Sequence, residues 1–268
     1  LAFLSVTVLS LHAQLRIGIF GGIANYQGDL VDEMYQSPRP VVGVHAAYEI
    51  NKRISLRAGL SFARVAGADS LSESDVLRHR NLDFQTNIYE FSLVGEINFL
   101  DMELKRWSPY AFGGAAVFRF DPFTRDQAGN RVYLQPLGTE GQGISGYANQ
   151  YNRTQLAVPF GGGIKFAVSE RLLLQAEVGL RKLFTDYLDD VSGNYADEAD
   201  LLAIRGPVAV DISYRSDEVG GDTFYPPKGT QRGSPKYKDY YYFTGLHIFY
   251  RLGGATKKDR LGCPEVKL

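Results

Sequence analysis

The sequence of 268 residues lacks any run of 18 apolar residues, which excludes a membrane span formed by a single helix. It has only one cysteine, so internal disulfides cannot hold the fold together. The formal net charge is −1, from 29 basic and 30 acidic residues, and gives no reason to expect a nucleic-acid partner. No nucleophile stands in a motif with a base and an orienting group, so we predict no catalytic residues, no cofactor and no enzyme.

Glycine and aromatic residues are abundant instead, with 29 Gly, 17 Tyr and 16 Phe. The hairpin at residues 155–180 shows how they are arranged. Apolar residues alternate with Gly163 and Lys165 in its first arm, and with Gln175 and Glu177 in its second arm. Glycine mixed with opposite charges suits the inside of a narrow closed barrel whose outer wall faces lipid.

The same alternation recurs along the chain. It predicts an all-β fold, a transmembrane antiparallel up-and-down β-barrel of about eight strands within residues 14–252. The expected strands are 15–26, 41–50, 54–65, 84–100, 110–120, 155–168, 172–181 and 241–252. An exported soluble β-sandwich also alternates, but it does not require the regular succession of short and long connections seen here.

An even number of strands places both ends of the barrel on one side of the membrane. The short turns near residues 51, 104 and 170 should lie on that side, which we expect to be periplasmic. The long connections 27–40, 66–83, 121–154 and 188–240 should then be extracellular loops. The predicted location is the cell outer membrane, with both termini in the periplasm.

The two ends of the chain have their own patterns. Residues 1–13 read as a partial signal peptide processed before Gln14, although a first strand that begins early remains an alternative. Residues 253–268 form a predicted periplasmic tail that contains Cys263. An odd cysteine in an exported protein indicates either a free thiol or an intermolecular disulfide. With its basic neighbours, the tail is a candidate partner-binding segment: Lys257, Lys258, Arg260 and Cys263.

Charged residues of both signs fall on the predicted lumen face. We interpret them as a salt-bridge network that plugs the barrel, with a narrow ion path as the alternative. The candidate network is Arg57, Glu90, Glu96, Arg119, Lys165, Glu177 and Arg181. In the segment 110–120 this places Arg119 in the lumen and Phe112, Phe118 and Phe120 on the lipid face.

Six acids cluster at the predicted external mouth of the barrel. A calcium site needs several oxygen ligands from a flexible loop, but this spacing matches no metal-binding loop. We therefore predict no metal and solvated carboxylates at Asp186, Asp189, Asp190, Asp197, Glu198 and Asp200. His45 and His247 fall on lumen faces, where packing is expected rather than metal binding.

Several motifs in order along the chain resemble those of PorG-like outer-membrane β-barrels of the Bacteroidota type IX secretion system. They are GGIANYQGDL at 21–30, SPYAFGG at 108–114, TEGQG at 139–143, TDYLDDVSGNY at 185–195, RGSPKYKDYYYFTG at 232–245 and LGCP at 261–264. The resemblance implies a scaffold that docks a periplasmic ring made of a PorK/GldK-like lipoprotein and a PorN/GldN-like subunit. It also suggests a disulfide between Cys263 and the lipoprotein.

The last strand is similar to the signal that the barrel insertion machinery reads, through Gly245, Ile248 and Tyr250. The expected partners are therefore that machinery, outer-membrane lipids and the periplasmic ring. The family also includes paralogous barrels, so other roles stay open. One alternative is a small OmpA-like structural barrel, adhesin or narrow channel. Another is a membrane-embedded hydrolase, against which the missing catalytic constellation counts.

Overall fold

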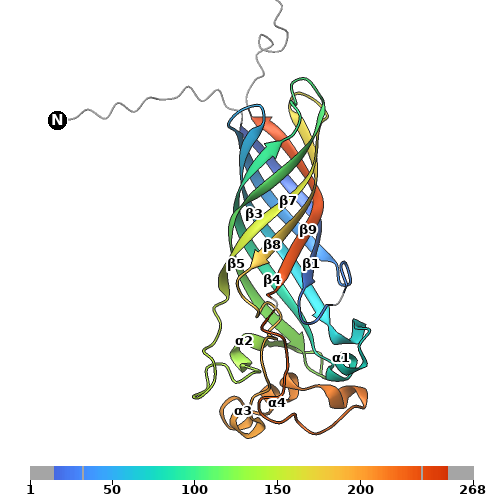
Figure 1. Ribbon diagram of the computed structural model, residues 1–268, viewed down its shortest axis with the longest axis vertical. Coiled ribbons are helices and arrows are strands. Elements are labelled where there is room, and N and C mark those ends of the chain that lie inside the picture. Colours follow the sequence, from blue (N-terminus) through green and yellow to red (C-terminus); the bar gives the residue numbers. More distant parts are fainter. Residues whose placement is uncertain (1–14, 32, 237, 253–268) are drawn as a thin grey trace, which may run out of the picture.

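The computed structural model describes residues 15–31, 33–236 and 238–252, which form a closed β-barrel with a folded cap at one end (Figure 1). Eight of the described strands make the barrel wall, and the short β6 at Arg131–Tyr133 pairs with the loop end of one of them. The wall strands are β1 Leu15–Gln27, β2 Arg39–Glu49, β3 Ile54–Ala68, β4 Asp83–Asn98, β5 Trp107–Arg125, β7 Thr154–Ala167, β8 Leu172–Leu183 and β9 Tyr240–Leu252.

Every wall strand is antiparallel to both of its neighbours. Consecutive wall strands pair along the chain, and β1 pairs with β9 to close the sheet. At this seam Leu15 lies opposite Leu252 and Gln27 lies opposite Tyr240. The eight observed strands overlap the eight predicted segments, and the predicted fold class is confirmed. The largest difference is β5, which is longer at both ends than the predicted segment 110–120.

The β7–β8 hairpin shows why these residues form wall strands. Phe160 and Ile164 are exposed on the outer face, while Lys165 and Glu177 are buried inside. The strands also approach closely, since a Cβ atom added to Gly163 would stand 1.9 Å from the carbonyl oxygen of Ala176. Glycine on the inner face therefore allows the wall to curve around a narrow lumen.

The connections differ sharply between the two ends of the barrel. The turns β2–β3, β4–β5 and β7–β8 are short and lie at the end where β1 begins and β9 ends (Figure 1). This end is called the short-turn end. The connections β1–β2, β3–β4, β5–β7 and β8–β9 are longer and lie at the other end, called the loop end. The predicted succession of short and long connections is thus observed.

The long loops are folded and carry helical segments. These are η1 Asp69–Leu71, α1 Asp75–Arg80, α2 Leu134–Leu137, α3 Glu198–Arg205, α4 Pro207–Ser213 and η2 Ser216–Val219. The Asp197 side chain caps α3 by accepting hydrogen bonds from the amides of Ala199 and Asp200. Buried loop residues such as Leu134, Leu188 and Val191 belong to the same apolar cluster as Phe118 and Phe120 inside the barrel. The loops and the part of the lumen nearest the loop end, called the upper lumen, therefore share one core.

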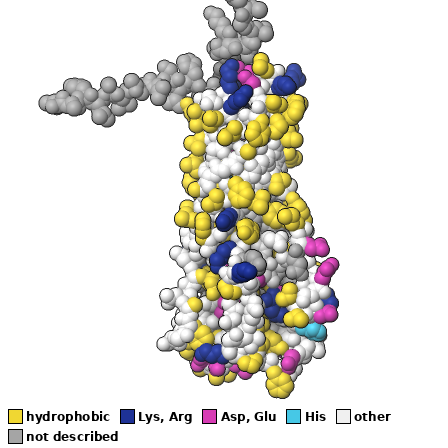
Figure 2. Space-filling model, viewed as in Figure 1, with side chains coloured by type: hydrophobic (Ala, Val, Ile, Leu, Met, Phe, Trp, Pro, Cys, Tyr) yellow, Lys and Arg dark blue, Asp and Glu magenta, His cyan; other side chains and the backbone are white. Residues whose placement is uncertain are grey.

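The outer wall carries a belt of exposed apolar side chains (Figure 2). Ile19, Leu60, Phe91 and Leu156 are among them, and all four are at least half exposed. Monomeric proteins in water rarely expose continuous apolar surfaces of this extent, whereas such a belt is the lipid-facing surface of a transmembrane barrel. No helix among the described residues is long and apolar enough to cross a membrane.

Candidate functional site in the lumen and loop cap

The centre of the lumen is filled by ion pairs around Glu96. The two carboxylate oxygens of Glu96 lie 2.9 Å from Arg57 Nε and 2.6 Å from Lys165 Nζ. The second guanidinium nitrogen of Arg57 lies 2.7 Å from Glu177. Tyr110 donates its hydroxyl to Glu177 over 2.6 Å. All these side chains are buried, so each buried charge has an opposite charge within contact distance.

A second pair lies nearer the loop end. Arg181 Nε is 3.2 Å from Glu90, and Tyr241 donates a 2.7 Å hydrogen bond to the same carboxylate. The guanidinium group of Arg181 also stacks over Phe243, 4.0 Å from the ring centre. At the short-turn end, Glu49 pairs with Arg16 and Arg251. The charges therefore occupy the lumen at three levels.

Two histidines lie beside the central ion pairs. His45 Nδ1 and His247 Nδ1 are 3.0 Å apart, and His247 Nε2 is 2.9 Å from Arg57. His247 also lies 3.4 Å from Glu177. The rings pack against Phe20, as expected for packing groups. Among the described residues, no group of three or more His, Cys, Asp or Glu side chains is placed to hold a metal ion.

Aromatic rings fill the lumen on the loop-end side of the central ion pairs. They form a continuous series of contacts from the barrel into the cap, with neighbouring ring centres 4.8–6.3 Å apart. The series is Phe20, Phe243, Tyr241, Phe118, Phe120, Tyr151 and Tyr187. Paired charges and packed rings thus follow one another through the lumen from the short-turn end into the cap.

One predicted member of the network is not in the lumen. The prediction for Arg119 was wrong, because its side chain is exposed on the outer face of β5. Phe112, Phe118 and Phe120 are buried inside, and their predicted lipid-facing position was also wrong. For Phe118 and Phe120 the physical reason is that the loop-end part of the lumen is apolar, so the apolar face of β5 points inward there. Phe112 lies inside among the central charges, with the Arg57 guanidinium 5.2 Å from its ring centre. The other six predicted residues are buried in the lumen, where Arg57, Glu96, Lys165 and Glu177 form one cluster and Arg181 and Glu90 form a separate pair.

Three of the six cap acids predicted to be solvated are buried, whereas Glu198 is exposed and Asp197 and Asp200 are partly exposed. Asp189 accepts a 2.5 Å hydrogen bond from the Tyr26 hydroxyl, which lies 3.1 Å from Asp239. Asp190 accepts from Thr139 over 2.5 Å and from Tyr151 over 2.6 Å. The prediction of solvation was wrong for Asp186, Asp189 and Asp190, since each is less than 4% exposed.

Burial controls the ionisation of these acids. Loss of hydration raises the pKa of Asp190 to about 6, while the nearby Arg232 guanidinium acts in the opposite direction. Burial also raises the pKa values of Asp189 and Asp239 well above their usual range, and the mutual repulsion of these carboxylates adds to the shift in Asp239. Burial thus favours the protonated forms of these acids.

Two arginines, the buried Arg232 and the partly buried Arg80, connect the loops to one another. Arg232 lies 3.1 Å from Glu140 and donates to the Asp190 carbonyl over 2.7 Å. Arg80 donates to Asp69 over 2.6 Å and to the Asp29 carbonyl over 3.1 Å. We did not single out these residues from the sequence. Glu140 and Arg232 do lie in the TEGQG and RGSPK motifs, so the motif positions were the available signal.

The remaining predicted sites fall on the last strand and beyond. On β9, Ile248 and Tyr250 are exposed on the lipid-facing wall, and Gly245 contacts the backbone of β1. Cys263, Lys257, Lys258 and Arg260 lie outside the described residues, as does the predicted signal peptide at 1–13.

The closed eight-stranded wall, its apolar belt and its filled lumen define an outer-membrane type of β-barrel. The family model described as "Domain of unknown function (DUF6089)" matches residues 1–206, and the chain belongs to this family. No curated protein sequence matches the chain significantly.

Solved structures of outer-membrane proteins are similar in fold. Neisserial surface protein A is 10% identical, with a TM-score of 0.44 over 90% of this chain and 98% of that one. Ail, the attachment invasion locus protein of Yersinia pestis, is 12% identical, with a TM-score of 0.41 over 89% and 97%. OprG from Pseudomonas aeruginosa is 10% identical, with a TM-score of 0.42 over 90% and 97%. At these identities the likeness concerns the fold alone.

Proposed function

We propose that the protein is an outer-membrane component of the type IX secretion system that docks the periplasmic lipoprotein-containing ring at the membrane. The observation that carries this proposal is the filled lumen, with Lys165 only 1% exposed between its partners. A barrel plugged by buried ion pairs is poorly suited to passing solutes and well suited to anchoring. The ordered sequence motifs supply the link to this particular machine.

The geometry of the chain ends also supports docking. Leu15 and Leu252 are paired at the short-turn end, so the tail that follows Leu252 starts from the same end as β1. We propose that this end faces the periplasm and that the cap lies outside the cell. The tail would then present Lys257, Lys258, Arg260 and Cys263 to the ring, which is PorK/GldK-like and PorN/GldN-like in this proposal.

Assembly is part of the same proposal. The outward position of Ile248 and Tyr250 on the closing strand supports recognition of β9 by the barrel insertion machinery. Several motifs behind the resemblance build the cap, through Asp189, Asp190, Arg232 and Asp239. These motifs therefore support the resemblance of the barrel and its cap to the PorG-like family. The proposed docking role depends on the tail instead.

Cys263→Ser in the native host is the direct experiment. We expect non-reducing electrophoresis of envelopes to show a heavier, thiol-sensitive band that contains this barrel and the ring lipoprotein. The substitution should abolish this band and leave the barrel folded, as judged by its heat-dependent mobility. An identical band in the Cys263→Ser strain would refute the disulfide, and full retention of the ring after deletion of 253–268 would refute the docking role.

The second candidate function is a small OmpA-like structural barrel, adhesin or narrow channel. The folded cap, with its exposed Leu202, Ile204 and Phe224, favours the adhesin form of this alternative. Planar-bilayer recording separates out the channel form, because a plugged lumen should give no steady conductance. Regular single-channel steps from the purified barrel would favour the channel over the scaffold.

A further inference from the structure

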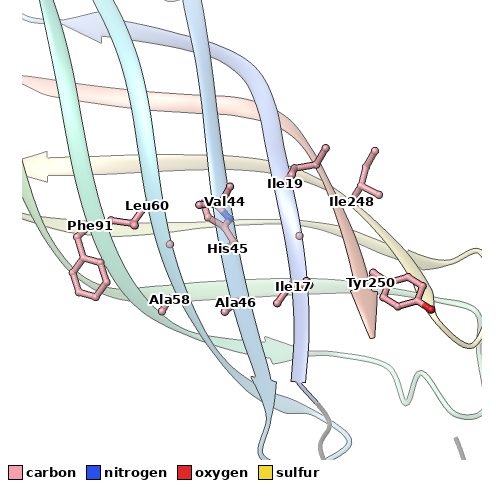
Figure 3. Close-up of a pocket in the computed structure, with 12 residues that line it drawn as sticks. Ile17, Ile19, Val44, His45, Ala46, Ala58, Leu60, Phe91, Ile248 and Tyr250 are labelled. Atoms are coloured by element: carbon pink, nitrogen blue, oxygen red, sulfur yellow. The ribbon is translucent and has the colours of Figure 1, made fainter. Parts of the chain in front are cut away.

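A groove runs along the outer wall of the barrel, and Figure 3 shows the residues that line the part of it nearer the short-turn end. Its lower part, nearer the short-turn end, crosses β9, β1, β2, β3 and β4. Its upper part, nearer the loop end, crosses β2, β3, β4 and β5. Both parts include Val44, Leu60 and Phe91, so the groove is continuous. The floor of its lower part is formed by Ala46 and Ala58, which are cross-strand partners on β2 and β3. Their small side chains leave the space that larger residues fill elsewhere in the belt.

The groove ends in positive charge at the loop end. The upper part is lined by Phe62, Tyr89 and Val117. The next outward-facing residues beyond Phe62 on β3 and beyond Val117 on β5 are Arg64 and Arg119. Arg119 lies opposite Tyr89 in the β4–β5 ladder. The two arginines therefore stand at the same end of one apolar channel.

Both guanidinium groups have donors to spare. Arg64 Nε donates to the Asn87 side chain over 2.9 Å, which orients the group and leaves its terminal nitrogens available. The Arg119 side chain makes no hydrogen bond or ion pair with any other residue that the structure describes. The neighbouring acid, Asp121, is 2.8 Å from Arg153 and is neutralised by it. No acid among the described residues forms an ion pair with either guanidinium group, so the groove ends in two positive charges.

We propose that this groove binds one membrane lipid with a phosphate-bearing anionic headgroup. The phosphate would lie between Arg64 and Arg119, because guanidinium groups form charge-assisted hydrogen bonds to phosphate oxygens. One acyl chain would follow the groove past Phe91 and Leu60 toward the Ala46–Ala58 floor. A lipid is the fitting occupant since the groove is part of the lipid-facing belt and its single charged end matches the single charged end of the molecule.

Native mass spectrometry of the full-length chain in detergent tests this site. We expect dipalmitoyl phosphatidylglycerol to be retained at one per barrel, roughly tenfold more tightly than the phosphatidylcholine of the same chain length. Glycerol phosphate, which supplies the headgroup without acyl chains, should not be retained. The double variant Arg64→Gln/Arg119→Gln should bind phosphatidylglycerol no better than phosphatidylcholine.

Two further variants make the result specific. Lys182→Gln removes an exposed cation at the loop end of β8, away from the groove, and should leave lipid retention unchanged. Ala58→Phe fills the groove floor and should weaken retention of both lipids. Heat-dependent mobility checks that every variant is folded. Equal retention of phosphatidylglycerol by the arginine double variant and the original protein would overturn the site, as would an equal loss in Lys182→Gln.

Discussion

At the scale of single residues, the lumen depends on carboxylates that each serve several donors. Glu96 forms ion pairs with Arg57 and Lys165 and accepts a 3.0 Å hydrogen bond from the Ser55 hydroxyl. Glu177 forms an ion pair with Arg57 and accepts a hydrogen bond from the Tyr110 hydroxyl. In a low-dielectric interior, an ion pair contributes little net stability compared with an apolar pair of the same shape, but removal of one partner leaves a costly isolated charge. The network is therefore most sensitive to the loss of a shared acceptor.

Glu96→Gln tests this sensitivity. The substitution keeps the shape of the side chain and leaves Lys165 without a counter-charge. We expect the free energy of unfolding in detergent to fall by about 3–5 kcal/mol, measured from the urea midpoint. Glu103→Gln is the matched control, because Glu103 pairs with Lys52 where both side chains are more than half exposed. Its cost should be below about 1 kcal/mol, and equal losses in the two variants would contradict the shared-acceptor role of Glu96.

At the scale of the elements, the wall strands follow from local pattern. In seven of the eight strands, the apolar residues that the alternation predicts to face lipid do lie on the outer face, although β1, β4 and β9 also bury rings or apolar side chains inside, such as Phe20, Phe84 and Phe243. β5 departs from the pattern because its inner face meets the aromatic core of the upper lumen, which includes Phe118 and Phe120. Alternation locates a strand but cannot say which of two apolar environments its apolar face meets. This is why Arg119 was assigned to the wrong side.

The cap was the other part that local pattern did not provide. The sequence predicts loops at 121–154 and 188–240, but the structure folds them around Glu140, Arg232 and Asp190. These residues lie far apart in the chain and meet only in three dimensions. An acid in a loop is ordinarily solvated, so its burial follows from contacts that no local spacing reveals.

Glycine on β7 gives a prediction at this scale. In Gly163→Ala, the new methyl group would collide with the Ala176 carbonyl of β8, and the hairpin must shift its backbone to accept it. We expect a loss of at least about 1–3 kcal/mol in unfolding free energy, together with a lower yield of heat-modifiable barrel. Gly21→Ala is the control, since no atom lies within 4 Å of the position of its added Cβ. Equal yields of the two variants would contradict the close approach of β7 and β8.

At the scale of the whole molecule, the cap and the barrel are joined through one apolar core but differ in their polar chemistry. Barrel charges are paired with opposite charges, whereas several cap acids are buried beside hydroxyl groups or other acids, such as Tyr26 with Asp189 and Asp239. Protonation should therefore affect the cap more than the wall. The two parts are expected to respond differently to acid.

A pH dependence follows with a definite sign. The pKa of Asp190 in the folded cap is about 6, above its ordinary value of 3.8. Unfolded chains therefore lose this proton first as the pH rises, and cap stability falls between about pH 4 and pH 6, by about 3 kcal/mol for this group alone. Hydrogen exchange of residues 185–195, corrected for intrinsic rates, should show stronger protection at pH 5 than at pH 7.

The Asp190→Asn variant should lose part of this difference, while Asp211→Asn, at an exposed carboxylate of α4, should keep all of it. Groups that face Asp190 are Thr139, Tyr151 and Arg232, with Glu140 nearby, and each stays unchanged in both variants. Equal protection at the two pH values in the original protein would contradict the assignment.

The pairing of β1 with β9 also constrains how the protein is made. These strands hold the two ends of the described chain, so the seam joins residues more than 200 positions apart and is among the contacts with the greatest loop-closure entropy. Until the last strand arrives, β1 exposes an unpaired edge that can template aggregation. A chain whose β9 has not yet paired with β1 is therefore an open sheet. Efficient assembly would need a helper that shields the edge of β1 until β9 is delivered.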